Sequence, residues 1–357
     1  MNLMELGWNA GFQTEFEKLS RLDLVPARVS NVMKGHLRVR LEGGELLAKL
    51  AGKLLFQARH SSDLPAVGDW VAIEAHECEE RAIIHHLLPR RTTISRKNPG
   101  RATHEQVIAA NVDTVFVVAA LNHEFNLRRL ERYVAMVWDS GAQPVILLNK
   151  ADLCQNISAR VLEAELCAPG VAAHAISAGD GVGFDVLFDY LGAGRTCAFI
   201  GSSGVGKSTI INRLLGREVQ STLPVRETDD RGRHSTTSRQ LFALCSGGLV
   251  IDTPGMRELQ LWDADSGLAA TFEDIDEIAM QCRYRDCSHR AEPGCAVQAA
   301  AESGQLDVAR LANFVKLRAE QAFLDRKVDI HAAQEAKARA RLLCKGLREV
   351  TKFKNRT

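Results

Sequence analysis

The residues from Cys197 to Ile211 read C-A-F-I-G-S-S-G-V-G-K-S-T-I-I, and this stretch decides how the middle of the chain folds. An apolar run ends at Gly201, and the segment from Gly201 to Ser208 fits the phosphate-loop pattern G-x-x-x-x-G-K-[ST]. Glycines let the backbone wrap tightly behind a buried strand, so that consecutive N–H groups point at one phosphate. A helix that starts at about Lys207 turns the positive end of its dipole toward the same anion. The stretch therefore predicts a strand, a loop that binds a nucleoside triphosphate, and a helix.

This loop supplies a set of candidate nucleotide-binding residues. Lys207 would reach the β- and γ-phosphates, and the Ser208 hydroxyl would take one coordination position on Mg²⁺. A Gly/Ser loop that binds nothing is the alternative, but the complete fit to the motif and the amphipathic run from Thr209 to Leu215 argue against it. The candidates are Gly201, Ser202, Ser203, Gly204, Val205, Gly206, Lys207, Ser208 and Thr209.

Length and composition are those of an ordinary protein of two or three domains. The chain has 357 residues, 46% of them apolar, and its net charge of +1 says nothing about partners. Glu5, Glu15 and Glu17 interrupt the N-terminal residues, so we expect no signal peptide, and no run approaches the ~18 apolar residues of a membrane helix. Nine unevenly spread cysteines indicate a reducing compartment. We expect a cytoplasmic monomer that does not enter membranes.

Short alternating runs follow an amphipathic lead over residues 1–20. They predict five strands separated by turn residues and no helix of any length, which favours a small β-barrel of the oligonucleotide-binding (OB) kind. An SH3-like barrel that binds protein or only packs stays open, because strand spacing does not separate the two. The expected strands are Val25–Val32, His36–Leu41, Glu45–Leu50, Trp70–Glu74 and Ala82–Leu88.

A basic segment runs from Arg81 to His104 and contains no acidic residue. It has two equally good interpretations. It is either a solvated linker or, beside an OB-type barrel, a strip that contacts nucleic-acid phosphates.

An α/β region begins with the apolar run Val112–Leu121, which predicts a strand buried on both faces. The next strand, Pro144–Leu148, is followed by N-K-A-D. The carboxylate of Asp152 can accept hydrogen bonds from N1–H and the N2 amino group of guanine, whereas adenine has no donor at either place. The motif thus predicts selection of guanine.

The neighbours of Asp152 complete the predicted base site. Asn149 would support O6 and N7 of guanine, the stem of Lys150 would lie over the ring, and Ala151 completes the motif. Ser177 and Ala178, in I-S-A-G, end another short strand, where a backbone N–H could meet O6. A strand-end Asn and an N-cap Asp would explain N-K-A-D without a nucleotide. Together with the phosphate loop, however, the two motifs indicate guanine binding.

A second phosphate-side motif is D-T-P-G, from Asp252 to Gly255, at the end of an apolar strand. Asp252 can bind Mg²⁺ through a water, and the Gly255 N–H can sense the γ-phosphate. The polar segment Arg217–Arg239 lies between the two phosphate motifs and has few apolar anchors. We expect γ-phosphate and metal to order it, with Thr236 as a Mg²⁺ ligand.

The C-terminal third contains the pattern C-x₄-C-x-H-x₅-C. Three thiolates and an imidazole so close together match a closed tetrahedral Zn²⁺ site, and a reducing compartment disfavours disulfides. Since all four positions would be protein ligands, the zinc would be structural rather than catalytic. The expected ligands are Cys282, Cys287, His289 and Cys295. Helices are expected over Leu306–Lys345, and the chain ends in a basic tail.

The order of the motifs resembles that of one family. Ordinary GTPases run phosphate loop, switch, D-x-x-G and then N-K-x-D, whereas here N-K-A-D and S-A-G come first. With the barrel, the segment G-R-H-S-T-T at Gly232–Thr237 and the Cys/His cluster, the chain resembles the circularly permuted GTPases over nearly its whole length. Within them it is similar to the ribosome small subunit-dependent GTPases. Ser235 departs from the family's usual Thr but keeps a hydroxyl, which leaves open only which hydroxyl meets the metal.

The resemblance implies a fold of three parts. A permuted α/β P-loop GTPase domain, residues 96–262, would lie between an OB-type barrel, residues 21–95, and a helical zinc domain with a basic tail, residues 263–357. Permutation would attach this last domain directly to the second switch.

The resemblance also implies a function. The chain would hydrolyse GTP slowly alone, bind the small (30S) ribosomal subunit and its rRNA in the GTP state during late maturation, and leave after hydrolysis. Met256 stands where other GTPases carry the water-orienting glutamine, and the resemblance implies that His234 positions the water instead. The alternative is that His234 only holds the switch conformation. A GTP-dependent switch on a protein partner away from the ribosome is the competing function.

Overall fold

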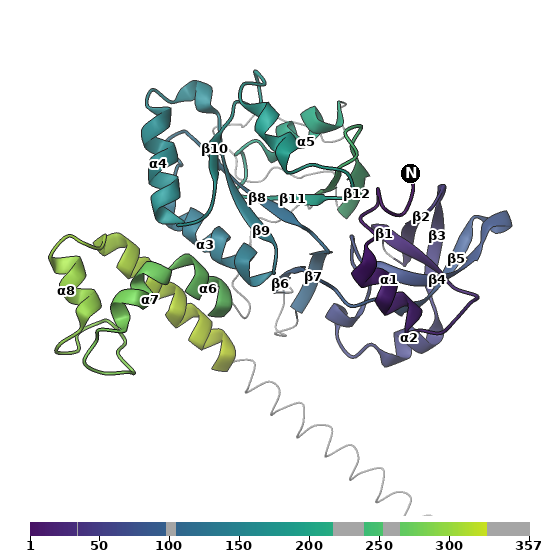
Figure 1. Cartoon of the computed structure of the whole chain (residues 1–357), viewed down its shortest axis with the longest axis horizontal. Coiled ribbons are helices and arrows are strands. Elements are labelled where there is room, and N and C mark those ends of the chain that lie inside the picture. The colour runs from purple at the N-terminus through teal and green to yellow at the C-terminus, as the bar shows by residue number, and fades with distance from the viewer. Residues whose placement is uncertain (34, 98–104, 217–238, 253–264, 327–357) are drawn as a thin grey trace, which may run out of the picture.

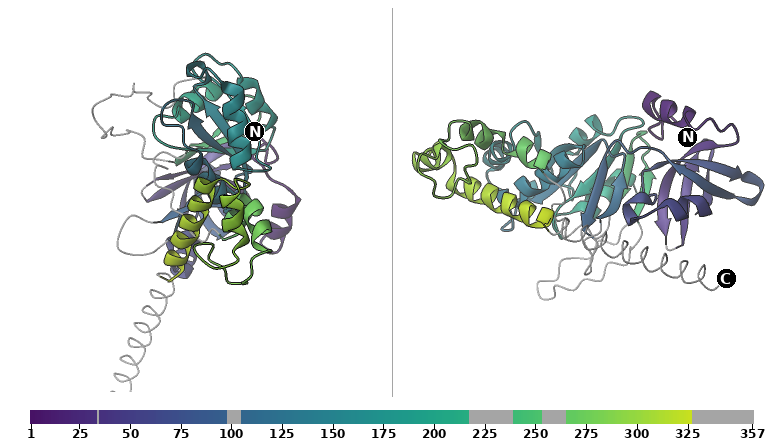
Figure 2. Two further views of the ribbon diagram at one scale, coloured as in Figure 1. Left: turned by 90° about the vertical axis from the view of Figure 1, so that its left-hand side faces the viewer. Right: turned by 90° about the horizontal axis from the view of Figure 1, so that it is seen from below.

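The computed structural model describes residues 1–33, 35–97, 105–216, 239–252 and 265–326. It places three parts in a row (Figure 1). A β-barrel lies at one end, an α/β domain in the middle and a group of helices at the other end. The same succession is visible from below (Figure 2).

The N-terminal part is a closed barrel of five strands, as predicted. Its strands are β1 (Val25–Met33), β2 (His36–Leu41), β3 (Gly44–Leu50), β4 (Trp70–His76) and β5 (Arg81–Leu87). β1 pairs antiparallel with both β2 and β4, and β5 lies between β3 and β4, so the ring closes. Alternating side chains such as Val29, Val39 and Ile73 are buried in its interior. Three short turns of helix join the strands: α2 (Gly52–Gln57), η1 (Ser61–Asp63) and η2 (Glu77–Glu79).

The N-terminal lead packs on this barrel. Helix α1 (Ala10–Glu17) begins after Asn9, whose side chain accepts hydrogen bonds from the first-turn N–H groups. Trp8 and Phe12 are buried, and the Trp8 ring stands edge-on to Trp70 of β4 at 4.7 Å between centroids. The lead is therefore part of the folded core.

The middle part is a sheet of six strands preceded by a hairpin. Its order is β10-β9-β8-β11-β13-β12, with all neighbours parallel except β12 and β13. The strands are β8 (Thr114–Ala120), β9 (Gln143–Asn149), β10 (Ala173–Ala175), β11 (Thr196–Ile200), β12 (Arg239–Ala243) and β13 (Leu249–Asp252). The hairpin consists of β6 (Thr93–Lys97) and β7 (Glu105–Ala110).

Helices cover both faces of this sheet, which explains the continuous apolar runs of its strands. On one face Val117 and Ile146 pack with Leu130, while on the other Phe116 and Phe199 pack with neighbouring apolar side chains. The helices of this domain are α3 (Leu127–Asp139), α4 (Ile157–Cys167), α5 (Lys207–Leu215), η3 (Ala151–Leu153) and η4 (Phe184–Asp189).

The barrel and the sheet are joined by backbone hydrogen bonds. β1 pairs antiparallel with β12, with Asn31 opposite Gln240, so the barrel strands and the six strands of the middle sheet form one continuous sheet, apart from the β6–β7 hairpin. Gly68 makes the close approach between the parts, because its φ is +92° and a Cβ there would lie 2.1 Å from the Ala110 carbonyl oxygen. The buried guanidinium of Arg28 donates to the Gly68 carbonyl at 3.1 Å. The barrel is thus fixed on the edge strand of the α/β domain.

Part of the basic segment has an interior role. Arg90 donates to both carboxylate oxygens of buried Asp69 and to the carbonyls of Ser62 and Leu64. Arg81 and Arg91 are exposed. The segment is therefore neither a plain linker nor one uniform exposed strip.

The C-terminal part packs on α3 of the middle domain. It contains α6 (Asp265–Thr271), α7 (Glu273–Ala279), α8 (Ala296–Glu302) and a helix over residues 308–326. Gly267 of α6 lies directly on the α3 backbone, since a Cβ there would lie 1.9 Å from the Ala135 carbonyl oxygen. Ala135 joins the apolar core of this part.

A buried ionic network centres this contact. Arg310, 5% exposed, donates to Glu131 of α3 at 3.0 Å and to both oxygens of Asp274. Glu131 is fully buried, and its second oxygen accepts from Asn313 at 2.6 Å. Arg128 also pairs with Glu131. The network ties residues 179 positions apart in the chain.

We expect Arg310→Met to destabilise the docking of the C-terminal part by about 3–5 kcal/mol, because it removes a principal partner of the buried Glu131 carboxylate. The measurement is urea unfolding, with hydrogen exchange of the α3 amides as the probe. Arg318→Met is the matched control: each arginine stacks on a phenylalanine ring, but the Arg318 side chain is exposed and its ion pair with Asp276 is 3.4 Å long. Equal stability losses in the two variants would contradict the role of the network.

Candidate nucleotide site and metal-binding cluster

The phosphate loop joins β11 to α5, in the strand–loop–helix order expected from the sequence. Gly201, Gly204 and Gly206 have φ values of +145°, +77° and +98°, which residues with a Cβ rarely adopt. A Cβ at Gly201 would lie 2.2 Å from the Val118 carbonyl oxygen, and a Cβ at Gly206 would lie 2.2 Å from Asn149 Nδ2. These glycines are therefore needed both for the turn and for its packing against neighbouring strands.

The loop presents donors to an anion. Gly206 is the N-cap of α5 and has no side chain to satisfy the first-turn N–H groups. Lys207 Nζ donates to the carbonyls of Gly201 at 2.7 Å and Ser202 at 2.6 Å, so the ammonium lies inside the loop. Ser203 and Gly204 are exposed at its tip, Val205 is buried beneath it, and Ser208 and Thr209 are half-buried in the first turn of α5.

The base-side residues lie at the end of β9. Asn149, 2% exposed, donates from Nδ2 to the Val205 carbonyl at 2.7 Å, and its Oδ1 accepts from the Ala178 N–H at 3.0 Å. One side chain thus links the phosphate loop to the S-A-G loop. The expected contact of Asn149 with O6 and N7 stays a prediction, for which one Nδ2 hydrogen remains.

Asp152 stands beside the S-A-G loop with its side chain exposed. The Ser177 hydroxyl lies 2.7 Å from Asp152 Oδ1 and 2.9 Å from Asp180 Oδ2, and its single proton can serve one of them at a time. Lys150 has a φ of +61°, which turns the chain between β9 and the η3 turn that begins at Ala151. The structure therefore brings the base-side and phosphate-side residues to one edge of the sheet.

Arg213 of α5 also helps to hold the base side of the site, although the sequence did not predict it. Its guanidinium donates to the carbonyls of Ala178 at 3.1 Å, Gly179 at 2.9 Å and Asp180 at 3.3 Å. It fixes the S-A-G loop against the helix that follows the phosphate loop. No motif marks Arg213, because the contact depends on how α5 packs beside a loop 35 residues earlier.

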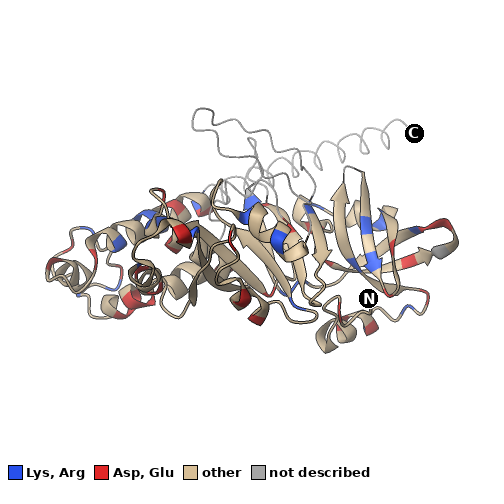
Figure 3. Ribbon diagram, turned by 90° about the horizontal axis from the view of Figure 1, so that it is seen from above, with Lys and Arg blue, Asp and Glu red and all other residues tan. Residues whose placement is uncertain are grey.

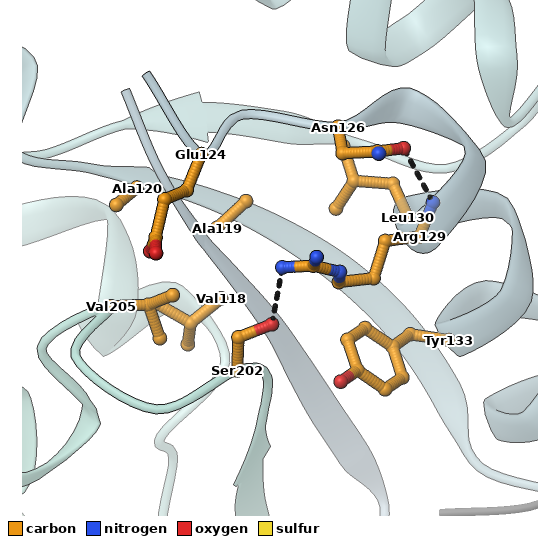
Figure 4. A pocket seen from close by; sticks show the side chains of 10 residues that line it. All are labelled: Val118, Ala119, Ala120, Glu124, Asn126, Arg129, Leu130, Tyr133, Ser202 and Val205. Atoms are coloured by element: carbon orange, nitrogen blue, oxygen red, sulfur yellow. Dashed lines mark hydrogen bonds between the residues drawn. The ribbon is translucent and has the colours of Figure 1, made fainter. Parts of the chain in front are cut away.

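The phosphate loop lies where the strand order of the sheet reverses. From β8 the chain proceeds outward to β9 and β10, then returns to β11 on the other side of β8. In open parallel sheets ligands bind at the carboxyl ends of strands at such a point. A small pocket opens there between β8, the start of α3 and the loop (Figure 4). Its lining includes Ala120, Asn126, Arg129, Tyr133 and Ser202.

The remaining phosphate-side residues are placed only in part. Asp252 is 5% exposed at the end of β13, the strand next to β11. Gly255, Thr236 and His234, together with Met256, lie outside the described residues.

The second candidate site is the Cys/His cluster of the C-terminal part. The ligand atoms of Cys282, Cys287, His289 and Cys295 all lie within 4.8 Å of one another. The Cys282 and Cys295 sulfurs are 3.9 Å apart, and His289 Nδ1 is 3.5 Å from the Cys295 sulfur. Two sulfurs about 2.3 Å from a tetrahedral ion would be about 3.8 Å apart. The geometry fits one metal ion.

The surroundings of the cluster hold its ligands. Gln298 donates to the His289 carbonyl at 2.6 Å, and the Cys295 sulfur lies at the N-terminus of α8, where it accepts from the Gln298 N–H. Burial lowers the pKa of His289, which favours the neutral imidazole that a metal needs. Glu292 accepts from Ser288 and Arg290 and so shapes the loop between the ligands.

The chain is similar to known GTPases in both sequence and structure. Residues 87–262 match the family model described as RsgA GTPase. The small ribosomal subunit biogenesis GTPase RsgA of Opitutus terrae is 45% identical, with all of both chains covered. The crystal structure of YjeQ from Thermotoga maritima superposes with a TM-score of 0.61 at 27% identity, over 82% of this chain and 97% of that one. YloQ, described as a circularly permuted GTPase, has the same TM-score at 24% identity, over 85% and 96%.

Fold, site and comparisons together define a circularly permuted GTPase: the loop that would read guanine precedes the phosphate loop in the chain, yet both meet at one sheet edge. The expected fold class is thereby confirmed. The chain belongs to the RsgA GTPase family. Within the described residues, none of the helices has the length and apolar character to cross a membrane.

We expect Asp152→Asn to weaken GTP binding by about 10–100-fold and to strengthen binding of xanthosine triphosphate, because the amide replaces an acceptor with a donor. The measurement is competition between the two nucleotides for a fluorescent analogue. Asp180→Asn is the matched control, since Ser177 contacts both carboxylates. Unchanged GTP affinity in Asp152→Asn would contradict its role in reading the base.

Proposed function

We propose that this chain binds GTP and Mg²⁺ at the edge of the sheet, hydrolyses the γ-phosphate by attack of a water, and works in a cycle with the small ribosomal subunit. One observation carries the proposal: the sheet order unites the base-side and phosphate-side loops although the chain presents them in reverse order. Relatives named small ribosomal subunit biogenesis GTPase match the chain over nearly its full length, which supports the choice of partner. We propose that it acts as a monomer, since one chain supplies both sites, and in the cytoplasm, since its nine cysteines suit a reducing compartment.

Each part of the site receives a role in this proposal. Asp152 accepts from N1–H and N2 of guanine, and Lys150 lies over the ring. The loop N–H groups and Lys207 bind the phosphates. Asn149 is hydrogen-bonded to both the phosphate loop and the S-A-G loop. It would therefore hold the base site and the phosphate site at a fixed separation.

Mg²⁺ suits the hydroxyl and carboxylate donors that the sequence offers on the phosphate side. Ser208 would ligate it directly and the buried carboxylate of Asp252 through a water, with Thr236 as a further proposed ligand. When bound, Mg²⁺ neutralises charge that develops on the transferred phosphoryl group. His234 is proposed to orient the attacking water, and Gly255 to sense the γ-phosphate.

For the Cys/His cluster we propose one structural zinc ion. Four protein ligands with tetrahedral spacing leave no position for a reacting water. The ion would fasten the loop between α7 and α8 to the apolar core of this part, to which Cys295 belongs.

We expect Cys287→Ala to purify with well under half of the wild-type zinc and to melt at a lower temperature, because one of four ligands is removed. Zinc is measured by a colorimetric chelator after denaturation, and melting by circular dichroism. Cys78→Ala is the control, since this cysteine is exposed on the barrel side and lies outside the cluster. A Cys287→Ala protein that keeps wild-type zinc and melting temperature would overturn the metal site.

The partner proposal draws on the barrel. Figure 3 shows Lys and Arg positions on the barrel strands, with acidic positions among them and at the far end of the barrel. Arg38 of β2 is exposed beside half-buried Arg40, and both form ion pairs with Glu45, so one carboxylate is shared between two arginines. OB-type barrels bind nucleic acid on such strand surfaces. Because β1 pairs with β12, a ligand bound to the barrel strands would lie on the same continuous sheet as the GTPase strands.

GTP turnover with and without purified small subunits tests the function. We expect the subunits to raise turnover by at least about tenfold, and His234→Ala to abolish this stimulation while nucleotide binding is kept. Sedimentation of the protein with the subunits should weaken steeply with salt, as phosphate contacts require. Turnover that ignores the subunits, with salt-independent sedimentation, would favour a GTP-dependent switch that acts on a protein partner.

A further inference from the structure

Residues in the first half of helix α3 face three different surroundings: the sheet, the C-terminal part and the pocket beside the phosphate loop. Leu130 and Val134 pack on the sheet. Arg128, Glu131 and Arg132 face the C-terminal part, where Arg128 pairs with Asp307 and Arg132 with Glu320. Arg129, with Asn126 and Tyr133, faces the pocket beside the phosphate loop (Figure 4).

Arg129 contacts the phosphate loop directly. Its Nη1 donates to the Ser202 hydroxyl at 2.8 Å (Figure 4). The carbonyl of the same Ser202 accepts from Lys207 Nζ at 2.6 Å. Two cations from different helices therefore meet on one loop residue, and one of them is the lysine whose type reaches the β- and γ-phosphates.

The charge of Arg129 is also uncompensated in the described part of the chain. Arg128 and Arg132, its neighbours on α3, each form ion pairs of their own, whereas Arg129 has no carboxylate within ion-pair distance among the described residues. Glu124 lines the same pocket without pairing with it. A neutral hydroxyl holds the guanidinium in place and leaves its charge available to an anion.

We propose that Arg129 is a positioning residue for the triphosphate: held on Ser202, it sets the γ-phosphate side of the loop and favours GTP over GDP. The inference rests on the proposed binding of GTP at this loop. When phosphates draw Lys207 away from the loop carbonyls, Arg129 keeps Ser202 in place and adds a fixed positive charge beside the terminal phosphate. GDP lacks that phosphate and gains little from the charge.

The docking of the C-terminal part contributes to this placement. Arg128 and Glu131 flank Arg129 in sequence and are both held by the buried network around Arg310. Rotation of α3 about its axis would break these contacts, so the network fixes the direction in which Arg129 leaves the helix. Asn126 caps the helix start by accepting from the Arg129 N–H at 3.2 Å.

The test uses the full-length chain and fluorescent GDP and non-hydrolysable GTP analogues. We expect Arg129→Ala to weaken the GTP analogue about tenfold and GDP by at most about twofold, in line with a charged hydrogen bond. Arg129→Lys should recover part of the difference, because it restores the charge without the fixed fork. Ser202→Ala should act in the same direction, and the double variant should lose less than the sum of the two.

Arg132→Ala is the matched control: it removes an arginine from the same helix, but its ion pair with Glu320 lies outside the buried network around Arg310, which stays intact. Its ratio of GTP to GDP affinity should equal that of the wild type. An Arg129→Ala variant that weakens both nucleotides equally, or neither, would overturn the inference. Failure of the wild type to bind guanine nucleotides at all would instead contradict the proposed function, so the two failures are distinguishable.

Discussion

The parallel pairing of β11 between β8 and β13 is the constraint on which the rest of this structure depends. It places the phosphate loop at the reversal of strand order, next to the ends of β8 and β9. Because of that position, Asn149 at the end of β9 can reach the Val205 carbonyl across the sheet edge. The geometry of the site follows from the sheet order and is independent of the point at which the chain was cut and rejoined.

The two ends of the α/β domain are joined to their neighbours by different physics. At the barrel, the join is a strand pair together with a close approach at Gly68, whose carbonyl accepts from the buried guanidinium of Arg28. At the C-terminal part, it is a buried ionic network, in which Glu131 is stable only because Arg310, Arg128 and Asn313 satisfy its oxygens. In the first join the accepting groups are backbone carbonyls, whereas the second consists of ion pairs and hydrogen bonds between side chains.

Much of the fold could be predicted from the sequence because its signals are local. Glycine spacing marks the phosphate loop, alternation marks the barrel strands, and close spacing marks the Cys/His cluster, which the structure brings within reach of one ion. The contacts that escaped prediction are long-range. Arg213 lies 35 positions from Ala178, and Arg310 lies 179 from Glu131. No window of sequence contains both partners of such a contact, and only the packing of helices on the sheet decides which arginine meets which oxygen.

The N-terminal lead is a further case of long-range contacts that the sequence did not predict. Its weak amphipathic pattern gave no sign that Trp8 and Phe12 meet Trp70, because Trp70 belongs to β4 of the barrel, far along the chain. Likewise α3 reads as one apolar stripe, while its polar residues divide between two other surfaces. A helix that touches three surfaces carries three patterns at once, and the apolar one dominates the periodicity.

Permutation gives this arrangement a mechanical consequence. Residues 217–238 end at β12, which is paired with β1 of the barrel, and residues 253–264 join β13 to α6, which lies on α3. Each of these segments thus ends at an element that contacts another part of the molecule. In an unpermuted order the chain would continue from D-T-P-G into the base-reading half, and the C-terminal part would hang from a different strand. Here the two segments expected to respond to the γ-phosphate lead directly into these contacts. Residues 217–238 lead into β12, which pairs with the barrel, and residues 253–264 lead into α6, which packs on α3. We therefore expect a change of nucleotide state to be passed to both neighbouring parts through these direct connections.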